Sequence, residues 1–124
     1  MLQLYAEFCL AKDLIHPNII EYKYFMRKYD PDSQNYEFHI IMELMDGENM
    51  EDYIEEQGPA LTLDQVKQIG GQLISSIKYL HEHKIIHQDL KPSNILFSGD
   101  YEKIKLTDLG ISNRLEGTRA TQHA

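Results

Sequence analysis

The spacing of apolar and polar residues changes several times along the chain, and each change predicts an element. Apolar residues recur at helical spacing over residues 2–14, which predicts a helix with one buried side. Residues 19–29 and 36–44 are rich in aliphatic and aromatic side chains, and the second run alternates as a strand does. The turn-forming residues 30–33 separate these runs. We therefore predict two antiparallel strands joined by a short loop.

A stronger helical pattern occupies the middle of the chain. Thr62, with Gln65 three residues later, fits a capping box at its start. An apolar stripe at helical spacing follows, made of Val66, Ile69, Leu73, Ile74, Ile77 and Leu80. The pair Gly70-Gly71 costs a helix about 1 kcal/mol per glycine relative to alanine, so we expect another segment to approach closely there.

Beyond that helix the pattern changes to short strand-like runs at residues 85–86, 95–97 and 104–106. Turn residues 98–100 separate the last two runs, so Asn94 to Thr107 is predicted to be a hairpin. Residues 116–124 are small and polar, which predicts a mobile tail.

Length and composition narrow the class of protein. The 124 residues suffice for one small domain, and 42% apolar with 26% charged residues is a typical globular mix. The formal charge of −8 would repel a phosphate backbone, so we expect no nucleic-acid partner. No apolar run is long enough to span a membrane, and the single Cys9 cannot form an internal disulfide, so we expect a cytoplasmic or nuclear location. Six acids and no base fall in residues 46–56, which predicts a short helix with an acidic surface, ending at Gly58.

Four polar residues around the predicted hairpin fit phosphoryl-transfer chemistry. Such a reaction needs placement and charge neutralisation more than covalent help from the protein. Asp89 would accept the proton of an attacking hydroxyl, and Lys91 would neutralise charge on the transferred group. Asn94 and Asp108 lie at opposite ends of the hairpin, so a tight return would bring their oxygens together around Mg²⁺. Magnesium retains water and nucleotide oxygens as ligands, so two protein oxygens suffice.

These residues also carry a resemblance to a known family. The segment His87-Gln88-Asp89-Leu90-Lys91-Pro92-Ser93-Asn94 resembles the catalytic loop of eukaryotic-type protein kinases. Asp108-Leu109-Gly110 resembles their magnesium-binding motif, with Leu109 where Phe is usual. The resemblance implies an α+β fold, as an incomplete protein kinase-like fold within residues 1–124. Residues 1–45 would be an N-lobe remnant with the hinge strand, and residues 46–124 would begin the C-lobe, including the catalytic loop and the metal-binding motif.

The same resemblance implies where ATP binds and which protein groups are modified. Glu7, nine residues before the segment His16-Pro17-Asn18-Ile19, sits where kinases carry a helix glutamate that pairs with a strand lysine. The implied ATP neighbours are the gatekeeper Met42, the backbone of Glu43 and Met45 at the adenine edge, Asn49 near the ribose and Leu96 under the adenine ring. Met42 and Leu96 fit ordinary core positions equally well. His87 is expected to support the loop rather than act as a base. Lys91-Pro92 is typical of kinases that modify serine or threonine hydroxyls of proteins.

The chain departs from the family pattern in four ways. It contains no G-x-G-x-x-G loop and no strand lysine before Glu7, and it carries no Ala-Pro-Glu landmark after Asp108. Gln88 stands in place of an arginine that holds a phosphorylated loop, so we expect no dependence on such a phosphate, and Thr118 and Thr121 are weak switch candidates. Ala11 stands where a larger residue completes a packing column with His87 and Leu109, so we expect that column to be loose.

The sequence thus predicts a segment of a serine/threonine protein kinase that uses ATP and Mg²⁺, inactive or nearly so as these 124 residues stand. The apolar faces of the helix and strands are expected to lack part of their cover, which would favour association with a protein partner. A non-catalytic interaction module or pseudokinase is therefore the alternative. A third alternative is a metal site formed by His81, Glu82 and His83.

Overall fold

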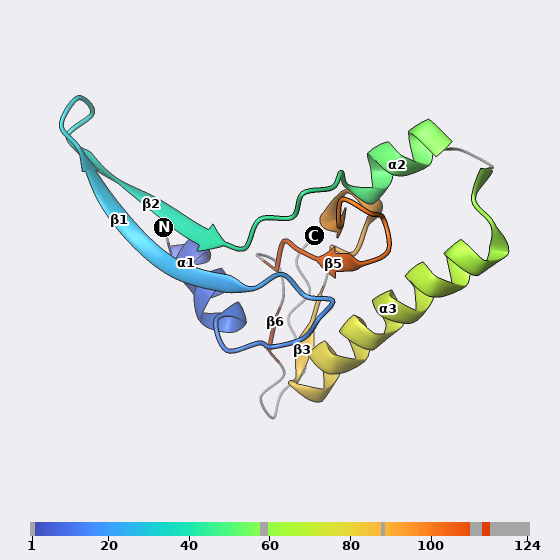
Figure 1. Ribbon diagram of the computed structural model, residues 1–124. Helices are drawn as coiled ribbons and strands as arrows, with labels where there is room; N and C mark the ends of the chain where they lie inside the picture. Colours follow the sequence, from blue (N-terminus) through green and yellow to red (C-terminus); the bar gives the residue numbers. More distant parts are fainter. Residues whose placement is uncertain (1, 58–59, 88, 110–112, 115–124) are drawn as a thin grey trace.

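The computed structural model of the chain describes residues 2–57, 60–87, 89–109 and 113–114. Its elements, shown in Figure 1, are α1 (Leu2–Ala11), β1 (Tyr22–Asp30), β2 (Asn35–Met42), α2 (Met50–Gln57), α3 (Leu63–Glu82), β3 (Ile85–Ile86), the 3₁₀ turn η2 (Pro92–Asn94), β4 (Ile95–Phe97), β5 (Ile104–Leu106) and β6 (Asn113–Arg114). The predicted α+β class is confirmed. The predicted mobile tail, residues 116–124, lies outside the described residues.

The first two strands form the predicted antiparallel hairpin. Tyr22 lies opposite Met42 and Asp30 opposite Asn35, with an irregularity between Tyr22 and Tyr24. Figure 1 shows this hairpin extending away from the rest of the molecule, with α1 alongside it. The contact with α1 is aromatic, because the Phe25 ring packs against Tyr5 and Phe8 with ring centroids 5.3 and 5.8 Å apart. The hairpin is therefore fastened near its base and middle, and its tip extends into solvent.

Helix α1 ends three residues before the predicted limit. The amide of Leu14 donates to the carbonyl of Ala11, which replaces the helical bond by a tighter turn. Leu14 itself is still buried, so it contributes to the core although it lies in a loop. Pro17 follows soon after, and proline disfavours helical backbone in the residue before it.

Helix α3 begins with the predicted capping box. The Thr62 hydroxyl accepts from the Gln65 amide, and the Gln65 side chain accepts from the Thr62 amide. Only part of the predicted apolar stripe is covered: Leu80 is buried, but Val66 and Ile74 are 51% and 68% exposed. The stripe thus predicted the helix correctly and its burial only in part.

The expected close approach at Gly70-Gly71 is wrong. A side chain at either glycine would meet nothing within 4 Å. The close approach lies at Gly47, where a Cβ atom would come within 2.6 Å of the Ser98 carbonyl oxygen. The Gly47 amide donates to the Phe97 carbonyl, so this residue must be small for the backbones to meet.

The core is centred on the β4–β5 hairpin. Ile95, Phe97, Ile104 and Leu106 are all at most 3% exposed. Ile95 lies opposite Leu106 and Phe97 opposite Ile104, as the sequence predicted for the Asn94–Thr107 hairpin. The backbone around Ile19 pairs with Leu106 on one side, and Asn49 pairs with Leu96 on the other. The hairpin is therefore flanked by backbone on both edges.

Two further features complete the fold. Helix α2 contains four of the six predicted acids, and its one buried side chain, Tyr53, packs against the Phe97 ring at 4.7 Å between centroids. No helix among the described residues is both long enough and apolar enough to cross a membrane.

Candidate active site

The segment between β3 and β4 carries the predicted base, Asp89. Pro92 opens the turn η2, where its fixed φ suits the first helical position and its missing N–H costs nothing. The Asn94 amide donates to the Lys91 carbonyl at 2.9 Å and closes the turn. Lys91 Nζ lies 3.3 Å from Asp89 Oδ2, with both side chains partly exposed. The predicted base and its neighbouring cation are thus together at the surface.

Asn94 is the buried member of the predicted site, at 6% exposure. Its Nδ2 donates to the Asp89 carbonyl at 2.8 Å and lies 3.4 Å from Asp89 Oδ2. Among the described residues, no hydrogen bond reaches Asn94 Oδ1. Because a buried acceptor without a partner costs about 1–3 kcal/mol, this oxygen is suited to a ligand.

Asp108 stands beside Asn94 through the backbone. The amide of Thr107, the residue before Asp108, donates to the Asn94 carbonyl at 2.9 Å. Asp108 is exposed and has a φ of 61°, a left-handed conformation that aspartate adopts more readily than most residues. The hairpin therefore closes at its mouth as predicted and brings the two backbones together.

His87 connects the Asp89 loop to the segment that carries Asp108. Its Nδ1 accepts from the Asp89 amide at 3.1 Å, so the ring proton must be on Nε2 in the neutral form. Nε2 then donates to the Thr107 carbonyl at 3.2 Å. Both ring nitrogens are occupied by backbone, which agrees with the expected supporting role and leaves neither free to act as a base.

The residues predicted to surround ATP lie along the segment after β2 and on β4. Met42 is 38% exposed at the end of β2. The Glu43 amide donates to the Glu21 carbonyl at 3.0 Å, whereas the Glu43 carbonyl has no hydrogen-bond partner in the described part of the chain. Neither the amide nor the carbonyl of Met45 is hydrogen-bonded within the described part of the chain.

Asn49 and Leu96 are brought together by an antiparallel bridge between their backbones. Asn49 Oδ1 accepts from the Asp52 amide at 2.9 Å and caps the start of α2. Its Nδ2 has no hydrogen-bond partner among the described residues. Leu96 packs on the edge of the core and is only partly buried.

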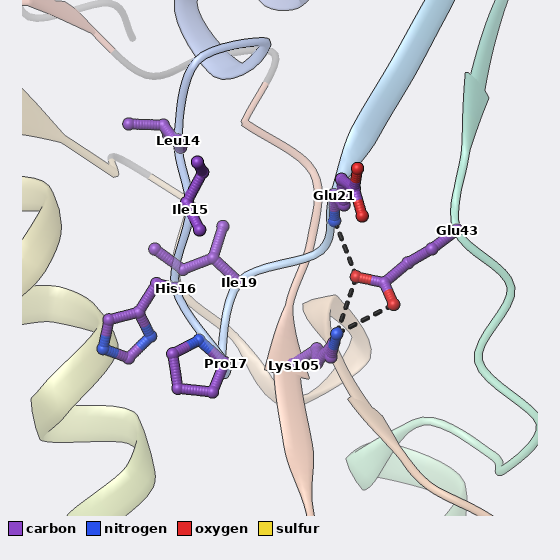
Figure 2. Close-up of a pocket in the computed structure, with 8 residues that line it drawn as sticks. All are labelled: Leu14, Ile15, His16, Pro17, Ile19, Glu21, Glu43 and Lys105. Atoms are coloured by element: carbon purple, nitrogen blue, oxygen red, sulfur yellow. Dashed lines mark hydrogen bonds and ion pairs between the residues drawn. The ribbon is translucent and has the colours of Figure 1, made fainter.

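The structure adds an ion pair that the sequence analysis did not predict. Lys105 Nζ donates to both carboxylate oxygens of Glu43, at 2.7 and 2.8 Å, and Glu43 Oε1 also accepts from the Glu21 amide. Figure 2 shows this pair at one side of a pocket of about 300 Å³, whose other side is the 14–19 segment. Partial burial would raise the pKa of Glu43, but the hydrogen bonds and charge of Lys105 outweigh it and lower the pKa. The two residues are 62 positions apart, so no local sequence pattern predicts their ion pair.

Glu7 has a partner that the sequence analysis also missed. The Tyr22 hydroxyl donates to Glu7 Oε1 at 2.8 Å and accepts from the Leu109 amide at 3.4 Å. Tyr22, Ala11 and Leu109 belong to one buried cluster, at 3%, 1% and 0% exposure. The expected looseness of the packing column around Ala11 stays a prediction, because burial alone does not measure how tightly these side chains pack.

The donor set at the hairpin mouth fits magnesium rather than a metal that needs a protein cage. No group of three or more His, Cys, Asp or Glu residues that could hold a metal exists in the described ranges. The site instead offers the amide oxygen Asn94 Oδ1, which accepts no hydrogen bond from the described residues, and one exposed carboxylate, Asp108. Magnesium keeps several waters and is commonly bound by one or two protein oxygens together with phosphate oxygens.

The proposed histidine metal site is wrong. His81, Glu82 and His83 do not form a metal-binding group. Instead, the His83 ring lies against Tyr79, with centroids 4.1 Å apart, and Glu82 lies 4.0 Å from Lys78. Three further predictions, on Gln88, Thr118 and Thr121, fall outside the described residues.

Comparison with known proteins identifies a family for this chain. Residues 2–124 match the family model of the protein kinase domain. The SNF-related serine/threonine-protein kinase of Rattus norvegicus is 34% identical over 113 residues, covering 91% of this chain and 14% of that protein. Serine/threonine-protein kinase PrkC of Bacillus subtilis is 35% identical over 111 residues, covering 90% of this chain and 16% of its own length.

A plant protein kinase has a similar identity to this chain and is also covered over only a small part of its length. The carbon catabolite-derepressing protein kinase of Secale cereale is 37% identical over 101 residues, covering 82% of this chain and 18% of that protein. The chain thus spans less than a fifth of the length of these three relatives. The match over residues 2–124, together with these identities, shows that the chain belongs to the protein kinase family.

Proposed function

We propose that this chain supplies the base and the magnesium ligands of a serine/threonine protein kinase that uses ATP. One observation carries the proposal. A continuous set of hydrogen bonds runs from the Asp89 carbonyl through the Asn94 side chain and backbone to the Thr107 amide, directly before Asp108. The proposed proton acceptor and both proposed metal ligands are therefore connected through hydrogen-bonded neighbours.

Each residue has a defined task in this proposal. Asp89 orients and accepts the proton of a protein serine or threonine hydroxyl. Lys91, which already pairs with Asp89, neutralises charge on the group that is transferred. Asn94 Oδ1 and the Asp108 carboxylate would hold Mg²⁺, which would supply charge neutralisation for the ATP phosphates.

The free backbone groups after β2 support an adenine site. The Glu43 carbonyl and the amide and carbonyl of Met45 are without hydrogen-bond partners among the described residues, and such groups match the donor and acceptor atoms of a purine edge. Met42, Asn49 and Leu96 would line that site. Glu7 would orient a phosphate-binding cation from another strand.

For a polypeptide of these 124 residues alone, we propose nucleotide binding with little or no transfer. The printed sequence contains no G-x-G-x-x-G loop to cover the phosphates and no strand lysine before Glu7. Transfer of labelled phosphate from ATP to a generic basic protein should stay at background. Transfer that is lost in Asp89→Asn would contradict this expected inactivity.

Magnesium-dependent nucleotide binding tests the function itself. A fluorescent ATP analogue should bind the wild-type chain more tightly with Mg²⁺ than with EDTA. Asp108→Asn should remove at least about tenfold of that gain, since a hydrogen bond or ligand bond to a charged group is worth about 1.5–3 kcal/mol and 1.4 kcal/mol is tenfold.

The matched control is Asp32→Asn, in the exposed loop between β1 and β2. It removes the same charge far from the hairpin mouth and should leave the magnesium effect unchanged. Equal magnesium dependence in wild type and Asp108→Asn would contradict the metal assignment. A wild-type chain that binds no nucleotide would contradict the proposed function.

A second candidate function, a non-catalytic interaction module, is favoured by the exposed apolar residues of α3. Leu63, Val66 and Ile74 are 69%, 51% and 68% exposed on this helix. This alternative predicts that the chain's cellular effect survives Asp108→Ala and is lost in Ile74→Ser. The kinase proposal predicts the reverse order of effects.

A further inference from the structure

The pocket of about 300 Å³ beside the Glu43–Lys105 ion pair has no task in the proposed chemistry. Its apolar wall consists of Leu14, Ile15, Pro17 and Ile19. Figure 2 shows Leu14, Ile15 and Ile19 on one side and the carboxylates of Glu21 and Glu43 on the other. Clefts of this size, with an apolar wall and a few placed polar groups, are typical binding sites. The pocket contains the Glu43 side chain, whereas the proposed adenine site uses the Glu43 backbone.

The polar side of the pocket carries an unbalanced negative charge. Lys105 Nζ donates to both carboxylate oxygens of Glu43, at 2.7 and 2.8 Å, so these two charges compensate each other. Burial raises the pKa of Glu43, but the hydrogen bonds and charge of Lys105 lower it by more, so Glu43 stays ionised at neutral pH. Glu21 also lines the pocket, and no hydrogen bond or ion pair from the described residues reaches its carboxylate.

Neither of the other two basic residues nearby supplies the compensating charge. His16 Nδ1 accepts from the Asn18 amide at 3.0 Å, which places the ring proton on Nε2, and Nε2 then donates to the Ser75 hydroxyl oxygen at 3.0 Å. Burial lowers the pKa of His16, so its ring is neutral at pH 7. The charge of Lys23 acts on Glu43, but Lys23 is not among the lining residues and forms no ion pair within the described ranges.

The apolar wall is fixed at its base and exposed at its rim. Leu14 and Ile19 are 6% and 3% exposed and belong to the core, so this part of the wall keeps its shape. Ile15 is 85% exposed, which is unusual for a large aliphatic side chain beside a pocket. A ligand that entered the pocket would therefore meet a rigid apolar surface first and could cover Ile15 from outside.

These properties select an arginine side chain among the common cations. A guanidinium group is planar and can donate two parallel hydrogen bonds to one carboxylate, here that of Glu21. Its weak hydration and its apolar stem suit the wall beside Pro17 and Ile19, whereas the ammonium group of lysine is more strongly hydrated. Lys105 opposes a second cation less than its charge suggests, because both oxygens of Glu43 already hold it.

We propose that this pocket is a docking site for an arginine side chain of a protein partner. The guanidinium pairs with Glu21, the stem packs on Pro17 and Ile19, and an apolar neighbour of the arginine covers Ile15. The formal charge of −8 on the chain favours approach of a basic segment. The inference goes beyond the proposed function, because this docking requires neither nucleotide nor magnesium.

The first test uses an acetylated pentapeptide amide of sequence Ala-Leu-Arg-Leu-Ala, added to the isotope-labelled chain without nucleotide or magnesium. The backbone amide signals of Ile15, Ile19 and Lys105 should shift in NMR spectra as the peptide binds. A peptide with citrulline in place of arginine has the same shape without the charge, and it should bind at least about threefold more weakly. Equal binding of the two peptides, or shifts that exclude all three amides, would overturn the proposal.

The second test assigns the charge to Glu21. Glu21→Gln should weaken the arginine peptide about 3- to 10-fold and make the arginine and citrulline peptides bind alike, because the charged partner is gone. Glu51→Gln, on the exposed surface of α2, is the matched control and should keep the wild-type difference between the peptides. Circular dichroism checks that both variants are folded. A Glu21→Gln chain that still prefers the arginine peptide as wild type does would overturn the pairing.

The third test separates a protein partner from a small guanidine. Butylguanidine carries the same head group without apolar neighbours, so it should bind at least about fivefold more weakly than the peptide. Ile15→Ser should weaken the peptide and leave butylguanidine binding unchanged, whereas Leu63→Ser, at a position 69% exposed on α3, should change neither. Equal binding of butylguanidine and the peptide would overturn the protein partner. Since nucleotide is absent throughout, failure of the proposed function would not affect these measurements.

Discussion

The two main hairpins of this molecule differ in burial, and the longer hairpin is the less buried one. The β1–β2 strands have nine and eight residues, yet Tyr22 is their one buried residue. The β4–β5 strands have three residues each, and the two end residues of each strand are buried. The short hairpin is the centre of the core, and its open end carries Asn94 and the segment leading to Asp108. Burial, rather than strand length, therefore decides which hairpin can hold a site in place.

The flanking backbone explains this difference. In the described part of the chain, β1 and β2 pair only with each other. The short hairpin has additional backbone on each edge, the Ile19 segment beside Leu106 and the Asn49 segment beside Leu96. A hairpin paired on both sides has its backbone groups satisfied and its side chains enclosed, so its open end moves little.

The largest expected effect is the loss of a core ring from the short hairpin. Phe97 is 0% exposed and packs against both Tyr53 and Tyr101, so Phe97→Ala should lower the free energy of unfolding by about 3–5 kcal/mol. Phe25→Ala makes the same change in the long hairpin, where the ring is half-buried, and should cost about 1–2 kcal/mol. Urea unfolding of both variants measures the contrast. Equal losses would show that the two hairpins contribute alike.

A smaller effect is expected where the chain before β1 meets the short hairpin. Asn18 is buried, and its Nδ2 donates to the Ile104 carbonyl at 3.0 Å and to Gln72 Oε1 at 2.9 Å. Asn18→Ala should cost about 1–3 kcal/mol of unfolding free energy, because buried acceptors lose their donor. Asn35→Ala, at the exposed start of β2, should stay within about 0.5 kcal/mol. A cost for Asn18→Ala no larger than this control would contradict the bridging role.

The ion pair between Glu43, just after β2, and Lys105 of β5 connects the two hairpins, and its contribution to stability can be measured. Glu43→Gln should lower the unfolding free energy by about 1 kcal/mol at pH 7, as expected for a partly exposed pair. The pKa of Glu43 is lowered in the folded chain from its ordinary 4.5, so this contribution is complete above that pH and disappears as the pH falls through the folded value.

Unfolding curves of wild type and Glu43→Gln at several pH values measure the contribution of this ion pair to the free energy of unfolding. Their difference should be constant above about pH 5.5 and shrink below pH 4.5. A difference that grows on acidification would have the wrong sign for a carboxylate stabilised in its charged form.

The smallest effect is expected on the exposed part of the long hairpin. Met26 is 48% exposed, so Met26→Ala should change the unfolding free energy by about 0.5 kcal/mol or less. It should also leave magnesium-dependent nucleotide binding as in wild type. A loss comparable to that of Phe25→Ala would mean that this part of the hairpin is enclosed in solution.

Local patterns predicted much of this fold. The antiparallel first hairpin, the capping box at Thr62 and the hairpin between Asn94 and Thr107 all depend on residues close together in the chain, and all are confirmed. The exposure of Val66 and Ile74 could not be predicted in this way, since helical spacing shows which residues share a face and not what covers that face.

The candidate site also contains some residues that local sequence patterns predict and others that they do not. Asp89, Lys91, Asn94 and Asp108 are predicted as site residues because their residue types and spacing fit one chemistry, and their roles stay predictions. The partners that hold neighbouring residues are not predicted in this way: Tyr22 is 87 positions from Leu109, and Glu43 is 62 positions from Lys105. Neither pair has a sequence signal, because tyrosine in a strand and glutamate beside one are ordinary.

The sequence by itself determined which oxygens and amines are available for chemistry and which segments form helices and strands, because both depend on residues within a few positions of one another. Only the tertiary structure decided that the shortest hairpin forms the core, that Gly47 rather than Gly70-Gly71 lies against another backbone, and that Tyr22 connects Glu7 to Leu109. The physical reason is that packing brings together residues far apart in the chain, and their free energy of contact depends on shape and burial rather than on spacing.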